Sequence, residues 1–472
     1  MPFFEEVVLA DFIGSANAPA RVAVIGSGPA GFYACEAFLK QADTRVRVDL
    51  FDRLPTPYGL VRGGVAPDHQ KIKSVIRLFE RTAGREGFRF FGNVSYGQDL
   101  TLEDFLAHYH QVLFCTGAET DRRMGIEGED LPGSFPATQF VGWYNGHPDY
   151  RHLRFDLSGE NAAVIGNGNV AMDVVRILAK PAASLADTDI ADYALEALRH
   201  SRIKTLWLLG RRGPAQAAFT NPEIRELAAI DGCDLVLQPS EVELDVLSRE
   251  FLDGVKDPVH QRNMDILTAH LEKGEGRQER KIRARFFVSP TAVLGAERVE
   301  GLRLERNKLV KDDSGALRAR GTGEMEEIPV ELVFRSIGYR GIALPGLPFD
   351  ERAGIIPNVD GRMVESPGGA TVPRLYVAGW IKRGPSGVIG TNKPDAIATV
   401  RAMLEDLPRQ TFPEALALAD EAVPTLLSQK GVRAVGFEDW KRLDQLEVER
   451  GKPAGKPREK FTTIATMLDA LS

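Results

Sequence analysis

Cysteine is scarce in this 472-residue chain, which contains only Cys35, Cys115 and Cys233. The three are far apart and form neither a C-x-x-C nor a C-x-x-x-x-C pattern. A redox-active dithiol and a cysteine-ligated iron–sulfur cluster need clustered cysteines, so the sequence excludes both. We also expect no bound metal ion.

Long apolar runs and an excess of positive charge are missing too. No apolar stretch approaches the length of a membrane helix. The net charge of -7 argues against general nucleic-acid binding, so an anionic partner would need a local basic patch. The first residues, MPFFEEVVLADF, contain two glutamates where a secretion signal would carry basic residues. We therefore expect a cytoplasmic protein without membrane insertion.

The remaining composition is that of a globular α/β protein. With 472 residues, of which 43% are hydrophobic and 26% charged, the chain is long enough for two domains. Strand-like runs alternate with helical periodicity, which favours parallel sheets covered by helices. The expected strands are 21–26, 46–52, 112–117, 162–166, 205–210, 332–338 and 375–379. The polar segment 272–285 breaks this pattern, and we expect a solvated surface loop there.

A dinucleotide-binding turn is predicted at the end of the first strand. Gly26 allows a tight turn, Gly28 lets the backbone approach a pyrophosphate, and Gly31 lets the following helix pack closely on the strand. The helix N-terminus then directs free N–H groups at the phosphates. Asp52 ends the next strand, where a ribose-binding carboxylate belongs.

A second turn of the same kind follows the strand 162–166, with Gly166, Gly168 and then Ala171 in place of the third glycine. The fingerprint permits alanine at that position. The next strand runs directly into Arg211 and Arg212, and two guanidiniums suit a 2′-phosphate rather than a free ribose hydroxyl. Asp187 and Asp189 lie nearer the usual spacing of a ribose-binding acid, but their surroundings indicate a helix cap.

This difference in charge suggests two different dinucleotides: FAD at the first turn and NADP(H) at the second. A hydride could pass from nicotinamide to flavin while the protein positions the two rings.

Three longer segments carry a family resemblance: Arg53–Val75, Gly210–Leu227 and Val377–Ala396. In this order they resemble the bacterial members of the adrenodoxin-reductase-type ferredoxin–NADP(+) reductases, and the resemblance covers essentially the whole chain. We expect two Rossmann-like three-layer nucleotide-binding domains, with the NADP domain (118–335) inserted into an FAD domain formed by 1–117 and 336–472. Segments 115–118 and 336–339 would be the crossovers between them.

The resemblance also implies individual site residues. His69 and Glu226 match polar residues that the family places near the isoalloxazine and nicotinamide rings, and they are the catalytic candidates. Those implied for FAD, with the glycines of the first turn, are Gly26, Gly28, Ala30, Gly31, Asp52, Leu60, Tyr96, Trp380, Gly387, Val388 and Ile389. Those implied for NADP(H) are Asn167, Gly168, Asn169, Val170, Arg211, Arg212 and Glu223, with Gly387 meeting both cofactors.

The implied activity is hydride transfer from NADPH to FAD and single-electron transfer to ferredoxin or a similar carrier. Because ferredoxins are typically acidic, we expect basic residues around the flavin edge. The candidates are Arg62, Lys71, Lys73, Lys382 and Arg383, with the run Arg277–Arg285 further away.

Three other functions are known for proteins with two dinucleotide-binding turns or with similar motifs. A disulfide reductase is rejected because no cysteine pair exists. A flavin monooxygenase is the alternative, since Phe140–Tyr150 approaches an oxygenase fingerprint, although His147 stands one position too late and Arg151 replaces the expected aromatic residue. A dinucleotide sensor without turnover also fits the spacing.

Overall fold

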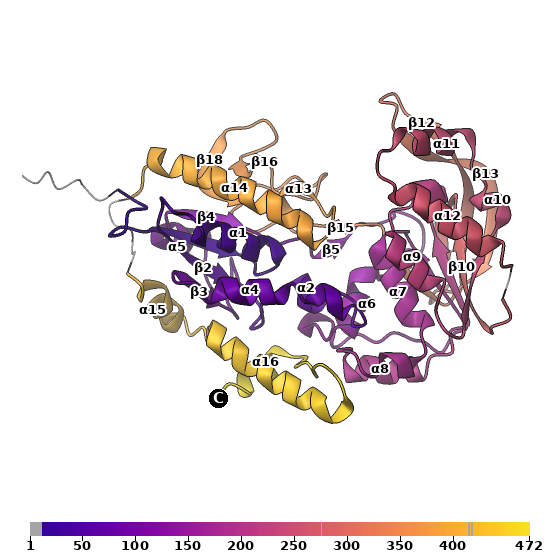
Figure 1. The fold of residues 1–472 in the computed structure, drawn as a ribbon, viewed down its shortest axis with the longest axis horizontal. Coiled ribbons are helices and arrows are strands. Elements are labelled where there is room, and N and C mark those ends of the chain that lie inside the picture. The colour runs from indigo at the N-terminus through magenta and orange to yellow at the C-terminus, as the bar shows by residue number, and fades with distance from the viewer. Residues whose placement is uncertain (1–11, 275, 414–415, 417–418) are drawn as a thin grey trace, which may run out of the picture.

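The computed structural model describes residues 12–274, 276–413, 416 and 419–472. The prediction made from the first eleven residues therefore lies outside the described part. The chain forms two lobes side by side, each built on its own parallel sheet (Figure 1). None of the described helices is long and apolar enough to cross a membrane.

The sheet of the first lobe has the order β16-β17-β18-β4-β1-β2-β3. Strands β18, β4, β1, β2 and β3 are parallel neighbours, and β16 and β17 add an antiparallel edge. Their bounds are β1 (Ala20–Ile25), β2 (Val46–Phe51), β3 (Phe88–Phe91), β4 (Gln111–Phe114), β16 (Asn358–Val359), β17 (Arg362–Val364) and β18 (Thr371–Val377). This sheet therefore combines the beginning of the chain with a segment near residue 375.

The sheet of the second lobe has the order β6-β14-β7-β8-β10-β9, with every neighbouring pair parallel. Its strands are β6 (Ser134–Pro136), β7 (Asn161–Ile165), β8 (Thr205–Leu209), β9 (Cys233–Leu237), β10 (Arg280–Arg285) and β14 (Leu332–Arg335). A three-stranded antiparallel sheet accompanies it, made of β11 (Val288–Leu294), β12 (Gly301–Lys311) and β13 (Leu317–Pro329). Between the lobes, β5 (Thr120–Asp121) pairs antiparallel with β15 (Tyr339–Arg340).

Helices cover both faces of the first sheet and one face of the second (Figure 1). The α-helices are α1 (Pro29–Leu39), α2 (Leu60–Gly63), α3 (Gln70–Lys73), α4 (Ile76–Ala83), α5 (Leu102–His108), α6 (Ala137–Tyr144), α7 (Asn169–Ala179), α8 (Asp192–Arg199), α9 (Asn221–Leu227), α10 (Pro239–Val242), α11 (Val246–Gly254), α12 (Val259–Leu271), α13 (Trp380–Arg383), α14 (Asn392–Asp406), α15 (Ala422–Gln429), α16 (Phe437–Gly451) and α17 (Ile464–Asp469). Short 3₁₀ turns are η1 (Pro148–Tyr150), η2 (Ala182–Leu185), η3 (Pro214–Gln216), η4 (Ile389–Thr391), η5 (Leu407–Arg409) and η6 (Lys452–Ala454).

The layers follow from the alternation of side chains along buried strands. In β7, Ala162 and Val164 face the helices, whereas Ala163 and Ile165 face the other way. The residues that meet this second face, such as Leu302 on β12, belong to the antiparallel sheet. The third layer of the second lobe is therefore the β11–β12–β13 sheet, a layer that the sequence did not indicate.

The expected α/β class with two Rossmann-like parallel sheets is confirmed, and each predicted strand overlaps an observed one. The interpretation of 272–285 as a surface loop is wrong for its second half, because Arg280–Arg285 forms β10 between β8 and β9. Its charges are compatible with this interior place because Arg285 is buried in ion pairs with Glu241 and Glu326. Asp189 does not cap a helix either: α8 begins at Asp192, and Asp189 is buried against Lys73 and Lys460.

Candidate functional site

The first turn has the geometry of a phosphate-binding loop. Gly26 follows β1 with a φ of 104°, and a Cβ there would lie 2.6 Å from the Cys115 carbonyl oxygen. A Cβ on Gly31 would lie 2.1 Å from the carbonyl oxygen of Gly26, so helix α1 packs directly on the turn. Gly28 is the N-cap of α1, and a Cβ there would meet nothing within 4 Å. The N-terminus of α1 thus borders open space, as an anion site requires.

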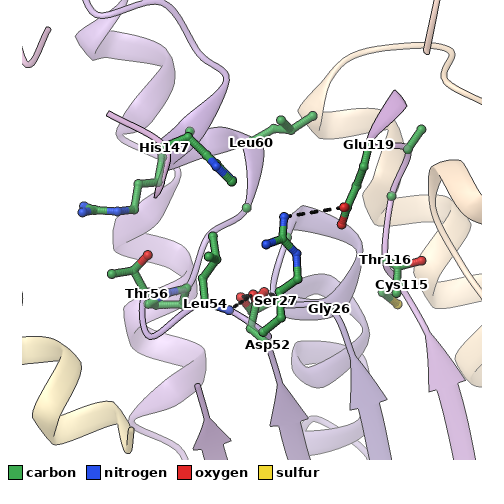
Figure 2. A pocket seen from close by; sticks show the side chains of 18 of the residues that line it. Gly26, Ser27, Asp52, Leu54, Thr56, Leu60, Cys115, Thr116, Glu119 and His147 are labelled. Atoms are coloured by element: carbon green, nitrogen blue, oxygen red, sulfur yellow. Dashed lines mark hydrogen bonds and ion pairs between the residues drawn. The ribbon is translucent and has the colours of Figure 1, made fainter. Parts of the chain in front are cut away.

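Asp52 lies beside this turn at the end of β2. One carboxylate oxygen accepts hydrogen bonds from the backbone N–H of Ser27 at 3.0 Å and from its hydroxyl at 2.5 Å. The other oxygen accepts one from the Leu54 N–H at 3.0 Å. Asp52 therefore connects the first turn to the segment that follows β2. It also lines a cavity in front of this turn (Figure 2).

A cavity of about 420 Å³ opens in front of the first turn and extends toward the second lobe (Figure 2). It brings together Gly26, Gly28, Ala30, Asp52, Leu60, Tyr96, Trp380 and Ile389 from the residues implied for FAD. Gly31, Gly387 and Val388 do not line it: Gly31 packs inside the fold, and Val388 is exposed. The cavity wall also contains polar residues that the sequence analysis missed.

Arg53 and His147 are the most informative of these missed residues. Arg53 pairs with Asp149 at 2.7 Å and with Glu119 at 3.5 Å, so charged groups from both lobes meet in the cavity wall. Burial lowers the pKa of His147 to about 4. A neutral imidazole therefore faces the cavity at pH 7. The sequence around His147 does not indicate that this residue lines the cavity. The oxygenase-like pattern that includes His147 is unrelated to this position.

The second turn repeats the first with a different neighbour. Gly166 has a φ of 124°, and a Cβ there would lie 2.1 Å from the Ser336 carbonyl oxygen at the end of β14. Helix α7 begins at Asn169, and a Cβ on its N-cap Gly168 would again meet nothing within 4 Å. The Asn169 side chain accepts a hydrogen bond from the Thr220 N–H at 2.9 Å, which holds the helix start against the segment before α9.

Arg211 and Arg212 follow β8 directly, next to this second turn. Arg211 is exposed and Arg212 is half-buried. Burial, with Arg211 and Arg318 nearby, lowers the pKa of Arg212. In the described part of the chain, neither guanidinium is paired with a carboxylate. An arginine pair surrounded by like charge and without an internal counter-ion is suited to an external anion.

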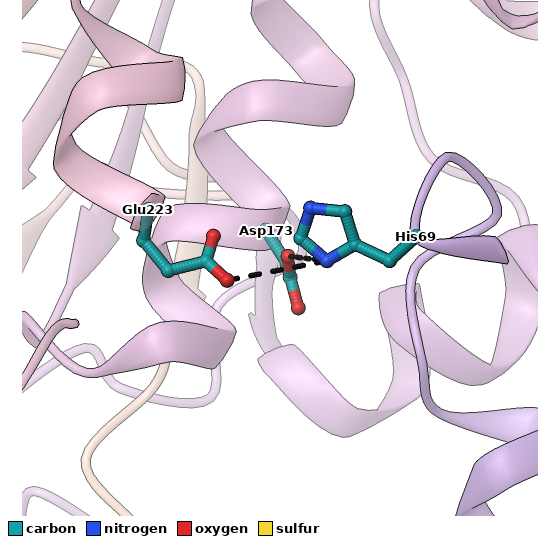
Figure 3. A group of neighbouring side chains, drawn as sticks. All are labelled: His69, Asp173 and Glu223. Atoms are coloured by element: carbon teal, nitrogen blue, oxygen red, sulfur yellow. Dashed lines mark ion pairs between the residues drawn. The ribbon is translucent and has the colours of Figure 1, made fainter. Parts of the chain in front are cut away.

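His69 and Glu226, the catalytic candidates, come together at the junction of the lobes. The His69 Nε2 lies 2.9 Å from a Glu226 carboxylate oxygen, and its Nδ1 faces Asp173 at 3.8 Å and Glu223 at 3.9 Å (Figure 3). His69 comes from the first lobe, and the acids lie on α7 and α9 of the second. The Glu226 side chain is half exposed, so this pair connects the junction to solvent.

Arg176 on α7 holds the junction together and was missed by the sequence analysis. Its side chain is 1% exposed, and its guanidinium donates to both oxygens of Asp68, at 2.9 and 3.0 Å. It also donates to Glu223 at 2.8 Å and to Asp173 at 2.6 Å. Although burial raises the pKa of Asp68, Arg176 and Lys180 lower it well below its usual range. Asp68 belongs to the first lobe, so Arg176 bonds the two lobes to each other.

The acids at this junction do not all ionise alike. Burial, together with the Asp173 charge, raises the pKa of Glu223 to about 7. Burial also raises the pKa of Asp173. His69, Asp173 and Glu223 offer ligand atoms within 4.8 Å of one another, which would suit a cation (Figure 3). Arg176 already supplies positive charge there, and the absence of a bound metal stays a prediction.

The basic residues expected around the flavin edge are mostly paired inside the protein. Arg62 pairs with the fully buried Glu447, and Lys73 with Asp189 at 2.7 Å. Lys382 pairs with Asp395 at 2.9 Å, and Arg383 donates to Asn392 at 2.9 Å. Of the five candidates, Lys71 is exposed. Four of the five cations are therefore paired or hydrogen-bonded within the fold, and a docking role for this set stays a prediction.

Comparison with known proteins agrees with this geometry. The pyridine nucleotide-disulphide oxidoreductase family matches residues 20–206. NADPH-ferredoxin reductase FprA of Mycobacterium tuberculosis is 45% identical over 468 residues, which cover 95% of this chain and 98% of FprA. The human mitochondrial NADPH:adrenodoxin oxidoreductase is 43% identical, with 96% of this chain and 92% of the relative covered.

A solved structure of M. tuberculosis FprA in complex with NADPH superposes with a TM-score of 0.89 at 44% identity, covering 96% of this chain and 99% of that one. The three cysteines of this chain are buried and unpaired, so the match to the pyridine nucleotide-disulphide family reflects nucleotide binding and not a dithiol. The chain belongs to the adrenodoxin-reductase-type family of NADPH–ferredoxin reductases.

Proposed function

We propose that the protein takes a hydride from NADPH, passes it to FAD, and delivers electrons singly to ferredoxin or a similar iron–sulfur carrier. This proposal rests on two phosphate-binding turns with opposite charge beyond them: Asp52 at one, and at the other Arg211 and Arg212, which have no carboxylate partner among the described residues. Bound FAD supplies the step from two-electron to one-electron chemistry.

The residues at the first turn fit FAD. The N-terminus of α1 offers N–H groups to a pyrophosphate, with room left in front of Gly28. Asp52 stands where a ribose-binding carboxylate belongs. The stacked Tyr339 and Trp380 rings, with centroids 5.4 Å apart, give the cavity an aromatic wall for a flat ring system. We therefore place FAD in this cavity.

The residues at the second turn fit NADP(H). Gly168 and the start of α7 face open space, as at the first turn. Arg211 and Arg212 would bind the 2′-phosphate, and Glu223 would lie close to the nicotinamide nucleotide. Between the two sites, His69 and Glu226 would move a proton between the junction and solvent through their 2.9 Å contact.

The domain division supports the same arrangement. We propose an FAD domain made of 1–117 and 336–472, with the NADP domain 118–335 inserted. Sheet membership supports it, because β1–β4 and β16–β18 share one sheet, whereas β6–β10 and β14 share the other. The β5–β15 pair lies where the chain passes between them. A cytoplasmic location remains our proposal as well.

Anaerobic rapid mixing tests the proposal. FAD-loaded protein mixed with NADPH should lose its oxidised-flavin absorbance quickly, and much faster than with NADH. Addition of a ferredoxin should then make cytochrome c reduction depend on the ferredoxin concentration. Slow bleaching with both nucleotides would indicate a sensor. Rapid NADPH oxidation that needs oxygen and an organic substrate, and ignores ferredoxin, would favour the monooxygenase alternative.

A further inference from the structure

The turn that carries Arg211 and Arg212 is held by the antiparallel sheet behind it. Three successive carbonyl oxygens of this turn each accept a hydrogen bond from that direction. The Val288 N–H donates to Gly210 O at 3.1 Å, and the Phe287 N–H donates to Arg212 O at 3.2 Å. Between them, the side-chain amide of Asn307 donates to Arg211 O at 3.0 Å.

These three donors differ in what the sequence must supply. The bonds from residues 287 and 288 use backbone N–H groups, which any residue except proline would provide. The central bond uses a side chain that has to reach the middle of the turn. Asn307 is therefore the one position among the three where the identity of the residue fixes the backbone between the two arginines.

The surroundings of Asn307 hold its amide in place. Asn307 is 7% exposed, and its own N–H donates to Phe287 O at 2.6 Å. The side-chain nitrogen also donates to the Ser289 hydroxyl at 2.7 Å, so both of its hydrogens are used. The β12–β13 pairing has a bulge between Glu305 and Asn307, an irregularity that redirects a side chain.

The backbone conformation of Phe287 also supports the turn that carries Arg211 and Arg212. Its φ of 56° lies in the left-handed region, which is unusual for an aromatic residue. Its ring packs under the turn, since a Cβ on Gly213 would lie 2.4 Å from the ring. The conformation of Phe287 brings its N–H to Arg212 O and its C=O to Asn307.

We propose that Asn307 is a positioning residue for nucleotide selectivity: it orients the peptide between Arg211 and Arg212 so that both guanidiniums meet the 2′-phosphate. This inference rests on the proposed function, in which the second turn binds NADP(H). It assigns the β11–β12–β13 sheet a role in recognition, although none of its residues has to touch the nucleotide for this.

The test compares binding of adenosine 2′,5′-bisphosphate and 5′-AMP to the FAD-loaded protein by calorimetry, since these probes differ only in the 2′-phosphate. Asn307→Ala should reduce the ratio of the two affinities by about fivefold to tenfold, the effect of one well-placed hydrogen bond, and leave 5′-AMP binding unchanged. Asn307→Leu, which is uncharged, of similar size and without a hydrogen-bond donor, should give the same loss if the alanine variant folds poorly.

Ser289→Ala is the matched control. It removes the other hydrogen bond of the same amide nitrogen and leaves the bond to Arg211 O, so the ratio should stay within about twofold of the wild type. An unchanged ratio in both Asn307 variants, or an equal loss in Ser289→Ala, would overturn the inference. A wild-type ratio near one would instead contradict the proposed NADP(H) site itself, so the two failures are distinguishable.

Discussion

The charged groups that follow the two turns differ in their partners. At the first turn the Asp52 carboxylate is hydrogen-bonded within the protein, whereas at the second the guanidiniums of Arg211 and Arg212 are available to a ligand. Asp52 accepts three hydrogen bonds from Ser27 and Leu54, so the carboxylate shapes its own loop. Arg211 and Arg212 have no carboxylate partner among the described residues, and it is their carbonyl oxygens that are held from behind. Because the two turns share their backbone geometry, selectivity between nucleotides depends on the charged groups and on the residues that position them.

Other cations of the protein resemble Asp52, because their charges are also paired within the fold. Arg176, Arg62 and Lys73 are cations that join distant segments, and each is almost fully paired with buried acids. Arg176 and Lys73 bond one lobe to the other, whereas Arg62 joins two segments of the first lobe. Substitutions can separate charges that stabilise the fold from charges that bind a ligand.

The largest effect is expected from Arg176→Met. The change leaves Asp68, Asp173 and Glu223 without their shared buried partner, which should lower the free energy of unfolding by about 3–5 kcal/mol. Lys180→Met is the control, because Lys180 is partly exposed and, within the described part of the chain, pairs only with Asp68. It should cost about 1 kcal/mol or less. Urea midpoints of the FAD-loaded proteins measure both, and equal losses would show that Arg176 has no special role.

The double variant Arg211→Ala, Arg212→Ala should abolish the preference for NADPH. Charge-assisted hydrogen bonds to a phosphate contribute about 1.5–3 kcal/mol each, so the loss of both arginines should lower kcat/KM with NADPH by at least about 100-fold. The value with NADH should change little. Arg199→Ala removes an exposed arginine that pairs with Glu196 and serves as the control. Comparable losses with both nucleotides would mean that these arginines are structural, like Arg176.

Local patterns allowed much of this arrangement to be predicted. Apolar runs that end in glycine predicted β1, β4, β7, β8 and β14. A buried parallel strand requires apolar residues, and the tight turn after it requires glycine. The glycine spacing and the residues at the following strand ends then identified both turns. Such features are local in the sequence, since one set lies within 26–52 and the other within 166–212.

Ion pairing between distant segments could not be predicted in this way. Arg62 finds Glu447 across 385 residues, and Lys73 finds Asp189 across 116. A basic residue in a flavin-binding segment resembles a docking residue until its partner is known. The strand β10 was missed for a related reason, since its charged residues fit an interior strand only because Arg285 meets Glu241 and Glu326.

Gly31→Ala tests the close packing at the first turn. A Cβ 2.1 Å from the Gly26 carbonyl oxygen meets backbone, so α1 has to shift, and overpacking of this kind costs about 1–3 kcal/mol. Both the stability of the FAD-free protein and FAD retention should fall. Gly28→Ala, whose Cβ would point into open space, should leave the stability unchanged and weaken FAD binding alone. Loss of stability in Gly28→Ala, with none in Gly31→Ala, would reverse this assignment.

Glu223→Gln tests whether a buried acid at the junction keeps its proton near neutral pH. The folded protein holds this proton up to a pKa of about 7, whereas the unfolded chain releases it near 4.5. The wild type therefore loses stability as the pH rises from 4.5 to 7, and glutamine removes that loss. The variant should gain about 1–2 kcal/mol on the wild type across this window, measured by denaturation at several pH values. Parallel pH curves would exclude a shifted Glu223.

The smallest effect is expected from Ala171→Gly, which gives the second turn the third glycine of the first. Ala171 is fully buried inside α7, so the change should cost about 1 kcal/mol through helix propensity. The ratio of kcat/KM values for NADPH and NADH should stay at the wild-type level, because Arg211 and Arg212 are untouched. If this single methyl group altered the ratio, the distance between helix and turn would also determine which nucleotide binds, and charge alone would no longer distinguish the two turns.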